Sequence, residues 1–150
     1  MPKKIDEAAA RAAFEAALAD YDQTFGTFFL ARLLGLEISY PDADTCAVEM
    51  ELKDFMFNPQ GTLHGGIIAT MLDISMGHLL KKTIGPGMTL EMKTQYLRPA
   101  RAGRVRALGT FLKKGKSINY LETRLYDADN SLLAVANSTW QLLPQTPAAS

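Results

Sequence analysis

The sequence predicts a single α+β domain in which a curved antiparallel β-sheet wraps around one long central helix. Residues 66–81 are apolar around nearly the whole helix circumference, so protein must cover that helix on most sides. One alternating stretch precedes the helix and four β-rich stretches follow it, joined by short connectors that favour antiparallel pairing. A chain of 150 residues with 47% hydrophobic content can bury the core that this arrangement requires.

Two helices and one strand are predicted before the long helix. Residues 6–20 are rich in Ala, Glu and Leu, which is typical of a helix docked on a surface. Residues 25–36 carry a run of Phe and Leu before Gly35, which indicates a short helix that glycine ends. Residues 45–53 alternate between apolar and polar side chains, as in a strand with one solvated face.

Four strands are predicted after the long helix, and their short connectors indicate an antiparallel meander. These strands span residues 88–97, 104–112, 118–126 and 132–143. The predicted organisation is an N-terminal helical extension over residues 1–24, the main domain over 25–143 and a flexible tail over 144–150.

Composition and charge exclude several classes of function. A formal net charge of zero argues against a nucleic-acid partner held by bulk charge. The apolar runs are too short to cross a membrane, and the basic N-terminus lacks the apolar segment of a signal peptide, so a cytoplasmic protein without a membrane partner is expected. Two histidines and the single Cys46 give little support to a metal site, and we expect no metal and no cofactor.

Residues 58–77 contain a carboxylate within an apolar helix. Asp73 lies in the middle of the long helix, where an unpartnered charge would cost several kcal/mol, so it requires a partner or a chemical role. Gly65 and Gly66 open the same helix and allow another group to approach backbone N–H donors that favour negative charge. An anion-stabilising helix end and a tuned carboxylate together indicate acyl chemistry.

This segment resembles the signature of the hot dog fold thioesterases of the phenylacetate-degradation (PaaI-like) type. The matching residues are the His64-Gly65-Gly66 triplet, Asp73 nine residues after the histidine and Asn58 six residues before it. The resemblance continues through Thr89, residues 95–99, Gly115-Lys116 and residues 127–136, so it covers roughly residues 25–143. It implies the hot dog fold and hydrolysis of an acyl-CoA thioester to free carboxylic acid and coenzyme A, which enters as part of the substrate.

The resemblance also implies catalytic roles for five residues. Asp73 acts as general base on water or as a nucleophile that forms a transient anhydride, and the sequence leaves both routes open. The Gly65 N–H is the expected oxyanion donor. Asn58 contacts the thioester or the water, against the alternative that it caps a turn. Thr89 helps to hold water near the carboxylate, and His64 positions the loop.

Helix spacing predicts a site shared between two chains. Gly65 and Asp73 are eight residues apart, which is about 12 Å along a helix, so one helix cannot bring both to one thioester. Two antiparallel helices related by a twofold axis can do so. We therefore expect self-association as a homodimer. A dimer of dimers is the expected larger assembly, and the sequence leaves the choice between dimer and tetramer open.

Seven basic residues and no acidic residue lie between Arg98 and Leu121. They are either the solvated edge of strands or a cradle for the phosphates of coenzyme A. The predicted substrate-binding and coenzyme A-binding residues are Gly66, Arg98, Lys114, Gly115 and Lys116.

Two competing functions are a hot dog fold hydratase and a protein that binds acyl-CoA without turnover. The identity of the acyl group is not predicted.

Overall fold

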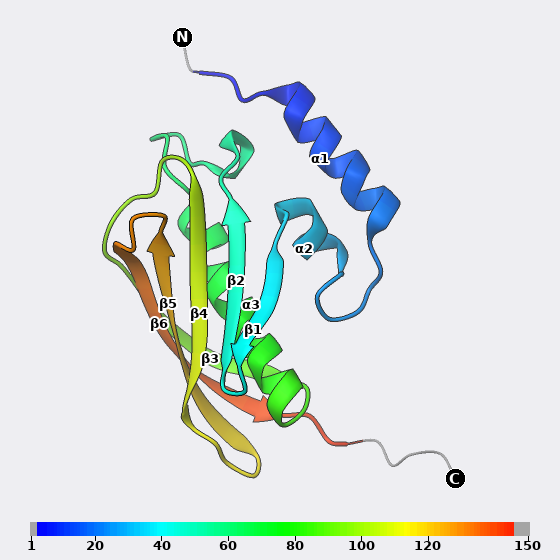
Figure 1. The fold of residues 1–150 in the computed structure, drawn as a ribbon, viewed down its shortest axis with the longest axis vertical. Coiled ribbons are helices and arrows are strands. Elements are labelled where there is room, and N and C mark those ends of the chain that lie inside the picture. Colours follow the sequence, from blue (N-terminus) through cyan, green and yellow to red (C-terminus); the bar gives the residue numbers. More distant parts are fainter. Residues whose placement is uncertain (1–2, 146–150) are drawn as a thin grey trace.

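The computed structural model describes residues 3–145, and its centre is a helix enclosed by one six-stranded antiparallel sheet (Figure 1). The helices are α1 (Glu7–Asp20), α2 (Phe29–Leu34) and α3 (Gly65–Thr83), with a 3₁₀ turn, η1, at Asp54–Met56. The strands are β1 (Glu37–Asp42), β2 (Thr45–Glu51), β3 (Gly87–Tyr96), β4 (Arg104–Lys113), β5 (Ile118–Asp127) and β6 (Leu132–Leu142). The tail predicted over 144–150 lies outside the described residues from position 146 onward.

The predicted central helix is confirmed as α3, one residue longer at its start and two longer at its end. His64 caps its N-terminus, because the His64 Nδ1 accepts a hydrogen bond of 2.9 Å from the Gly66 N–H. Its buried face packs on β2, β3, β4 and β5. Met71, Leu72 and Met76 are wholly buried there, so α3 forms the middle of the hydrophobic core.

The strand order is β1-β2-β4-β5-β6-β3, which corrects the predicted meander. Strands β4, β5 and β6 do pair in succession, but β3 lies at the far edge and bonds only to β6. The first strand after α3 therefore forms one edge of the sheet, and β1 forms the other. The chain also contains β1, which the sequence did not predict, because Pro41 and three polar residues leave only Ile38 and Tyr40 as apolar positions.

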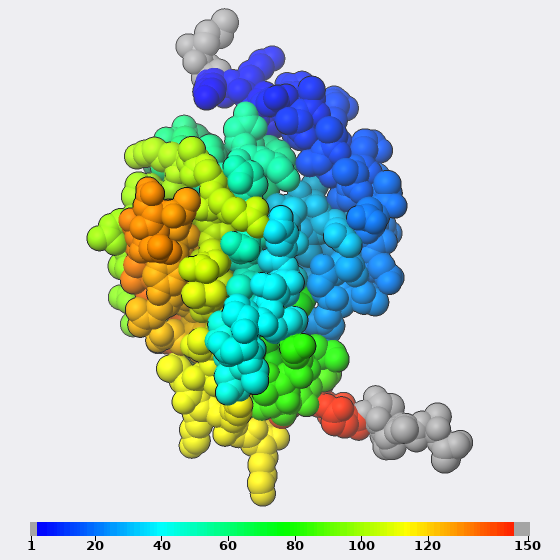
Figure 2. Space-filling model, viewed as in Figure 1, coloured from blue at the N-terminus to red at the C-terminus, as the bar shows by residue number. Residues whose placement is uncertain are grey.

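The N-terminal segment lies along one side of the molecule, where its blue atoms are visible in Figure 2. The helix predicted over 6–20 is confirmed as α1. Phe14 of α1 and Tyr21, the residue that caps its C-terminus, make edge-to-face pairs with Phe29 of α2. The short helix predicted from residue 25 begins at Phe29, and Gly35 ends it at a φ of 68°. Within residues 3–145, no helix combines the length and the apolar character needed to span a membrane. The division at residues 24 and 143 stays a prediction.

Candidate active site

Asp73 projects from the middle of α3 toward the start of β3. Its carboxylate is half-buried, and Oδ1 accepts a hydrogen bond of 2.7 Å from the Thr89 hydroxyl. Thr89 pairs in register with Trp140 of β6, a buried residue, so both face the helix. Burial raises the pKa of Asp73, and the Thr89 hydrogen bond opposes that rise. A carboxylate of raised basicity next to a hydroxyl can accept a proton from water.

Asp73 lines a cavity of about 370 Å³ beside α3. Gly77, one turn after Asp73, lines the same cavity. Trp140 fills the space next to Gly77, because a Cβ at Gly77 would lie only 2.8 Å from Trp140 Cη2. The glycine thus lets the indole lie against the helix. The indole then becomes a wall of the cavity that contains Asp73.

The start of α3 presents a free backbone donor. The Gly66 N–H is already bound to His64, but the hydrogen bonds of residues 3–145 include none donated by the Gly65 N–H. The Tyr96 hydroxyl donates to the Gly65 carbonyl oxygen at 2.9 Å and holds this turn in place. Of the two glycine N–H groups, the one at Gly65 is therefore available to an external acceptor.

Asn58 organises the loop before α3. Its Oδ1 accepts hydrogen bonds from the backbone N–H groups of Gln60 and Thr62, and its Nδ2 donates to Thr62 Oγ1. These bonds are the turn-capping contacts that were the alternative interpretation of this residue. A role in catalysis stays a prediction. Asn58 also lines a second cavity, of about 320 Å³, together with Gly65, Tyr96 and Arg98.

The two halves of the expected machinery lie in different cavities of one chain. Asp73 lines the first cavity and Gly65 lines the second, and no residue is common to both. Eight residues of α3 separate them, a rise of about 12 Å. This separation agrees with the requirement for a second copy that the helix spacing predicted.

Comparison with known proteins decides the family. Residues 60–134, half of the chain, match the thioesterase superfamily. A candidate esterase of Saccharolobus solfataricus is 31% identical over 115 residues, covering 75% of this chain and 81% of that protein. The chain belongs to the thioesterase superfamily. A medium/long-chain acyl-CoA thioesterase of Salmonella typhimurium is 25% identical over 129 residues, covering 74% of this thioesterase and 83% of its relative.

Solved structures confirm the hot dog fold. A Bacillus halodurans protein determined with CoA superposes with a TM-score of 0.85 at 21% identity, covering 96% of this thioesterase and 97% of that chain. A candidate thioesterase of Ralstonia eutropha, described as related to phenylacetic acid degradation, has a TM-score of 0.70 and 28% identity and covers 75% and 89%. Membership of the superfamily confirms the predicted hot dog fold thioesterase and the predicted thioester hydrolase, and the Ralstonia eutropha protein supports the PaaI-like type.

The basic residues of this thioesterase do not gather at one place in the chain. Arg98 donates from Nη1 to the Leu132 carbonyl at the start of β6 and lines the cavity of Gly65. Lys114 and Lys116 lie in the β4–β5 hairpin at the other end of the sheet (Figure 1). Within one chain, Arg98 and the two lysines therefore lie at opposite ends of β5, a strand about 33 Å long.

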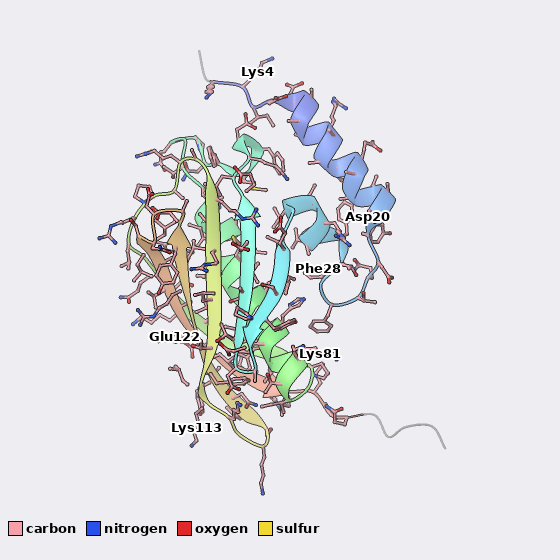
Figure 3. The ribbon with its side chains drawn as sticks, viewed as in Figure 1. Lys4, Asp20, Phe28, Lys81, Lys113 and Glu122 are labelled. Carbon is pink, nitrogen blue, oxygen red and sulfur yellow. The ribbon has the colours of Figure 1, made fainter. Side chains whose placement is uncertain are left out.

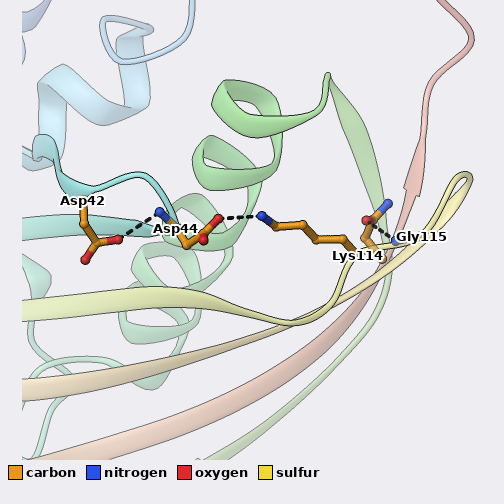
Figure 4. Close-up of polar contacts among 5 residues, drawn as sticks. Asp42, Asp44, Lys114 and Gly115 are labelled. Carbon is orange, nitrogen blue, oxygen red and sulfur yellow. Dashed lines mark hydrogen bonds and ion pairs between the residues drawn. The ribbon is translucent and has the colours of Figure 1, made fainter.

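The hairpin lysines differ in their surroundings. Lys114 Nζ lies 2.6 Å from Asp44 Oδ1, and the Gly115 N–H donates to Asn119 Oδ1 (Figure 4). Lys116 makes no ion pair with any described residue and lines a separate cavity near the end of β6. Of the two, Lys116 is the more available to an anionic ligand. Binding of coenzyme A by these residues stays a prediction.

Sequence reasoning missed three residues that shape the site. Tyr96 was noted within the resemblance but was not assigned a role, and its hydroxyl holds the Gly65 turn. His78 and Trp140 line the cavity of Asp73. His78 has one sequence signal, its place five residues after Asp73 on a buried helix, whereas Trp140 comes from a strand far along the chain and has none. Cys46 is a buried thiol, and its burial raises its pKa to about 12.

Proposed function

We propose that this thioesterase hydrolyses the thioester of an acyl-CoA to a free acid and coenzyme A, at a site shared by two copies of the chain. The observation that carries the proposal is the half-buried carboxylate of Asp73, held by Thr89 at the wall of an open cavity. The relative named as an acyl-CoA thioesterase and the structural neighbour determined with CoA support the substrate class.

Asp73 supplies the base or the nucleophile. In the first route, the carboxylate takes a proton from water as the water oxygen bonds to the thioester carbon. The tetrahedral oxyanion then collapses, the carbon–sulfur bond breaks and the thiolate of coenzyme A takes up a proton. In the second route, Asp73 itself attacks, the thiolate leaves and water hydrolyses the resulting anhydride. The raised pKa of Asp73 favours proton transfer in the first route and nucleophilicity in the second.

The Gly65 N–H of a second copy is our candidate for the donor to the oxyanion. It is unoccupied by the protein's own acceptors among residues 3–145, and it sits at a helix N-terminus where the dipole favours negative charge. Asn58 lines the cavity that contains this donor, which supports a contact between its amide and the same carbonyl group.

The open edge of β3 supports self-association. This strand pairs only with β6, so its outer backbone groups have no strand partner within the described chain. Three large apolar side chains of β3 are about half exposed, namely Met88, Leu90 and Tyr96. A long apolar edge strand is a template for pairing with a second chain. Antiparallel pairing of β3 with its copy would also place the two α3 helices antiparallel.

A panel of acyl-CoA substrates with detection of free thiol tests the activity. We expect thiol release by the wild-type chain and a loss of roughly a hundredfold or more in Asp73→Asn. Binding of acyl-CoA without thiol release would identify a binding protein instead. Hydration of an enoyl-CoA without thiol release would identify a hydratase.

A further inference from the structure

We propose that residues 23–28, the segment between α1 and α2, form the outer wall of the acyl-binding cavity, and that Phe25 and Phe28 limit the length of the acyl group. This inference rests on the proposed function, because it takes Asp73 as the position of the reacting carbonyl. Gln23, Thr24, Phe25 and Phe28 line the same cavity as Asp73. They lie in the N-terminal part of the chain, before the residues that match the superfamily model.

The two aromatic rings close the cavity against α3. Phe25 meets the His78 ring edge-on at 5.0 Å between centroids, and Phe28 stacks on the same ring at 6.0 Å. Lys81 Nζ lies 5.6 Å from the centroid of Phe25. Figure 3 labels Phe28 and Lys81 on the two segments that meet here. The contact is therefore formed by side chains between two elements that are distant in sequence.

The wall segment is held mainly by its own hydrogen bonds. The Asp22 N–H donates to the Thr27 carbonyl at 3.0 Å, and the Thr27 hydroxyl donates back to the Asp22 carbonyl at 3.0 Å. Gln23 Oε1 accepts from the Phe29 N–H at the start of α2. Gly26 provides the positive φ of 89° that the turn requires. The loop is thus a compact unit that keeps its shape when one of its aromatic side chains is changed.

The opposite wall contains two polar aromatic side chains, His78 and Trp140. His78 Nδ1 lies 3.1 Å from the Ile74 carbonyl oxygen, which can only accept, so Nδ1 carries the proton. Burial lowers the pKa of His78, and the neutral ring then has a lone pair on Nε2. His78 Nε2 and Trp140 Nε1 are buried and have no hydrogen-bond partner within residues 3–145. Both nitrogen atoms are turned into the packing of the wall, so the side chains present mainly carbon surface to the cavity.

The rise along α3 sets the length of acyl group that we expect the cavity to hold. From Asp73 to His78, where the aromatic rings close the cavity, the rise along α3 is about 7.5 Å, which an extended chain of about six carbon atoms fills. Longer acyl groups would have to displace Phe25 or Phe28. Phe25 is 53% exposed, so its truncation removes little packing and the fold should tolerate it.

Activity across a series of saturated acyl-CoAs tests the wall. We expect wild-type kcat/KM to fall once the chain exceeds roughly six to eight carbons. Phe25→Ala should raise the kcat/KM ratio of a long to a short substrate by about tenfold or more, because single-methylene discrimination in apolar pockets is of that order. Phe25→Trp should shift the preference toward shorter chains. Phe28→Leu, which keeps apolar packing, should act in the same direction as Phe25→Ala.

Phe14→Ala is the matched control, because Phe14 is 46% exposed, contacts Phe29 and does not line the cavity. Its length profile should coincide with that of the wild type. Profiles of Phe25→Ala and Phe25→Trp that run parallel to the wild-type profile, in folded proteins that hydrolyse acyl-CoA, would overturn the wall and leave the proposed function intact. Absence of hydrolysis by the wild type on every acyl-CoA would instead overturn the proposed function.

Discussion

Asp73 and Thr89 form the contact on which the proposed chemistry depends. Burial favours the protonated carboxyl and raises the pKa of Asp73, whereas the Thr89 hydroxyl donates to the charged form and favours it. The result is a carboxylate that is more basic than an exposed Asp and still has a specific partner. Both effects can be measured separately.

The first prediction concerns the stability of Asp73→Asn. The native Asp73 carboxyl binds its proton more tightly than the unfolded one, so the unfolded chain ionises first as pH rises and native stability falls. Asn cannot ionise, and its Oδ1 can still accept from Thr89. We expect the melting temperature of the variant at pH 7 to exceed that of the wild type by about 1–4 °C.

Circular dichroism across a pH series checks this sign. The difference between variant and wild type should shrink as pH falls through the raised pKa of native Asp73, and it should be gone below the pKa of an unfolded Asp, about 3.9. A variant that melts below the wild type at pH 7 would mean that the ionised carboxylate stabilises the native state, contrary to the direction of its pKa shift.

The second prediction is a change in the pH profile of Thr89→Val. Removal of the hydroxyl deletes the contact that lowers the pKa of Asp73, so that pKa should rise further. The active form is the carboxylate, and activity is therefore lost as pH falls through this pKa. We expect the acid limb of kcat/KM to move to higher pH, while Thr89→Ser keeps the wild-type limb. An unmoved limb in Thr89→Val would show that this hydroxyl does not tune the catalytic carboxylate.

At the scale of elements, α3 presents a backbone donor at its start and a carboxylate two turns later. The third prediction tests whether the Gly65 N–H itself, and not the space around it, contributes to catalysis. Gly65 follows the capping residue His64, whose ψ of 133° suits a following proline, and the first helical position accepts proline well. A Cβ there would lie 3.4 Å from the Tyr96 ring, an ordinary contact.

Gly65→Pro should therefore fold while it lacks the N–H, and Gly65→Ala should fold and keep it. We expect kcat to fall by about 10²–10³-fold in Gly65→Pro and far less in Gly65→Ala. Steady-state kinetics on the preferred acyl-CoA check the difference. Equal losses in the two variants would assign the effect to the added carbon atoms and not to the donor.

Local pattern predicted most of the elements because helices and half-buried strands have distinct periods. The four strands after α3 were located to within one or two residues. Strand order was not predictable, because the place of β3 beside β6 depends on long-range pairing and not on the connector that follows β3. β1 was missed because an edge strand with Pro41 needs few apolar residues.

The site was only partly accessible to sequence reasoning. Asp73 and Thr89 were placed together by the family resemblance, and the structure brings them to 2.7 Å. The aromatic wall was not predicted, because Phe25 and Phe28 fit the apolar pattern of the short helix expected from residue 25. Their contact with His78 spans about fifty residues of chain and depends on how the N-terminal segment folds back on α3.

At the scale of the whole molecule, the fourth prediction tests the edge of β3 as the contact between copies. Leu90 is 50% exposed on this unpaired edge, and Leu112 is 58% exposed at the end of β4. Leu90→Lys should weaken self-association and lower kcat/KM together, because charged edge residues block strand pairing. Leu112→Lys should change neither. Gel filtration with light scattering checks the size, and an unchanged dimer in Leu90→Lys would contradict this interface.

The most direct test of the account mixes two inactive variants. If Gly65 of one copy and Asp73 of another serve one thioester, a dimer of Gly65→Pro and Asp73→Asn chains has one site with both defects and one with neither. At random exchange about half the dimers are mixed, so activity should recover to roughly a quarter of the wild-type value. No recovery, despite heterodimers demonstrated with two differently tagged chains, would mean that each site is built within one chain and would contradict the shared site.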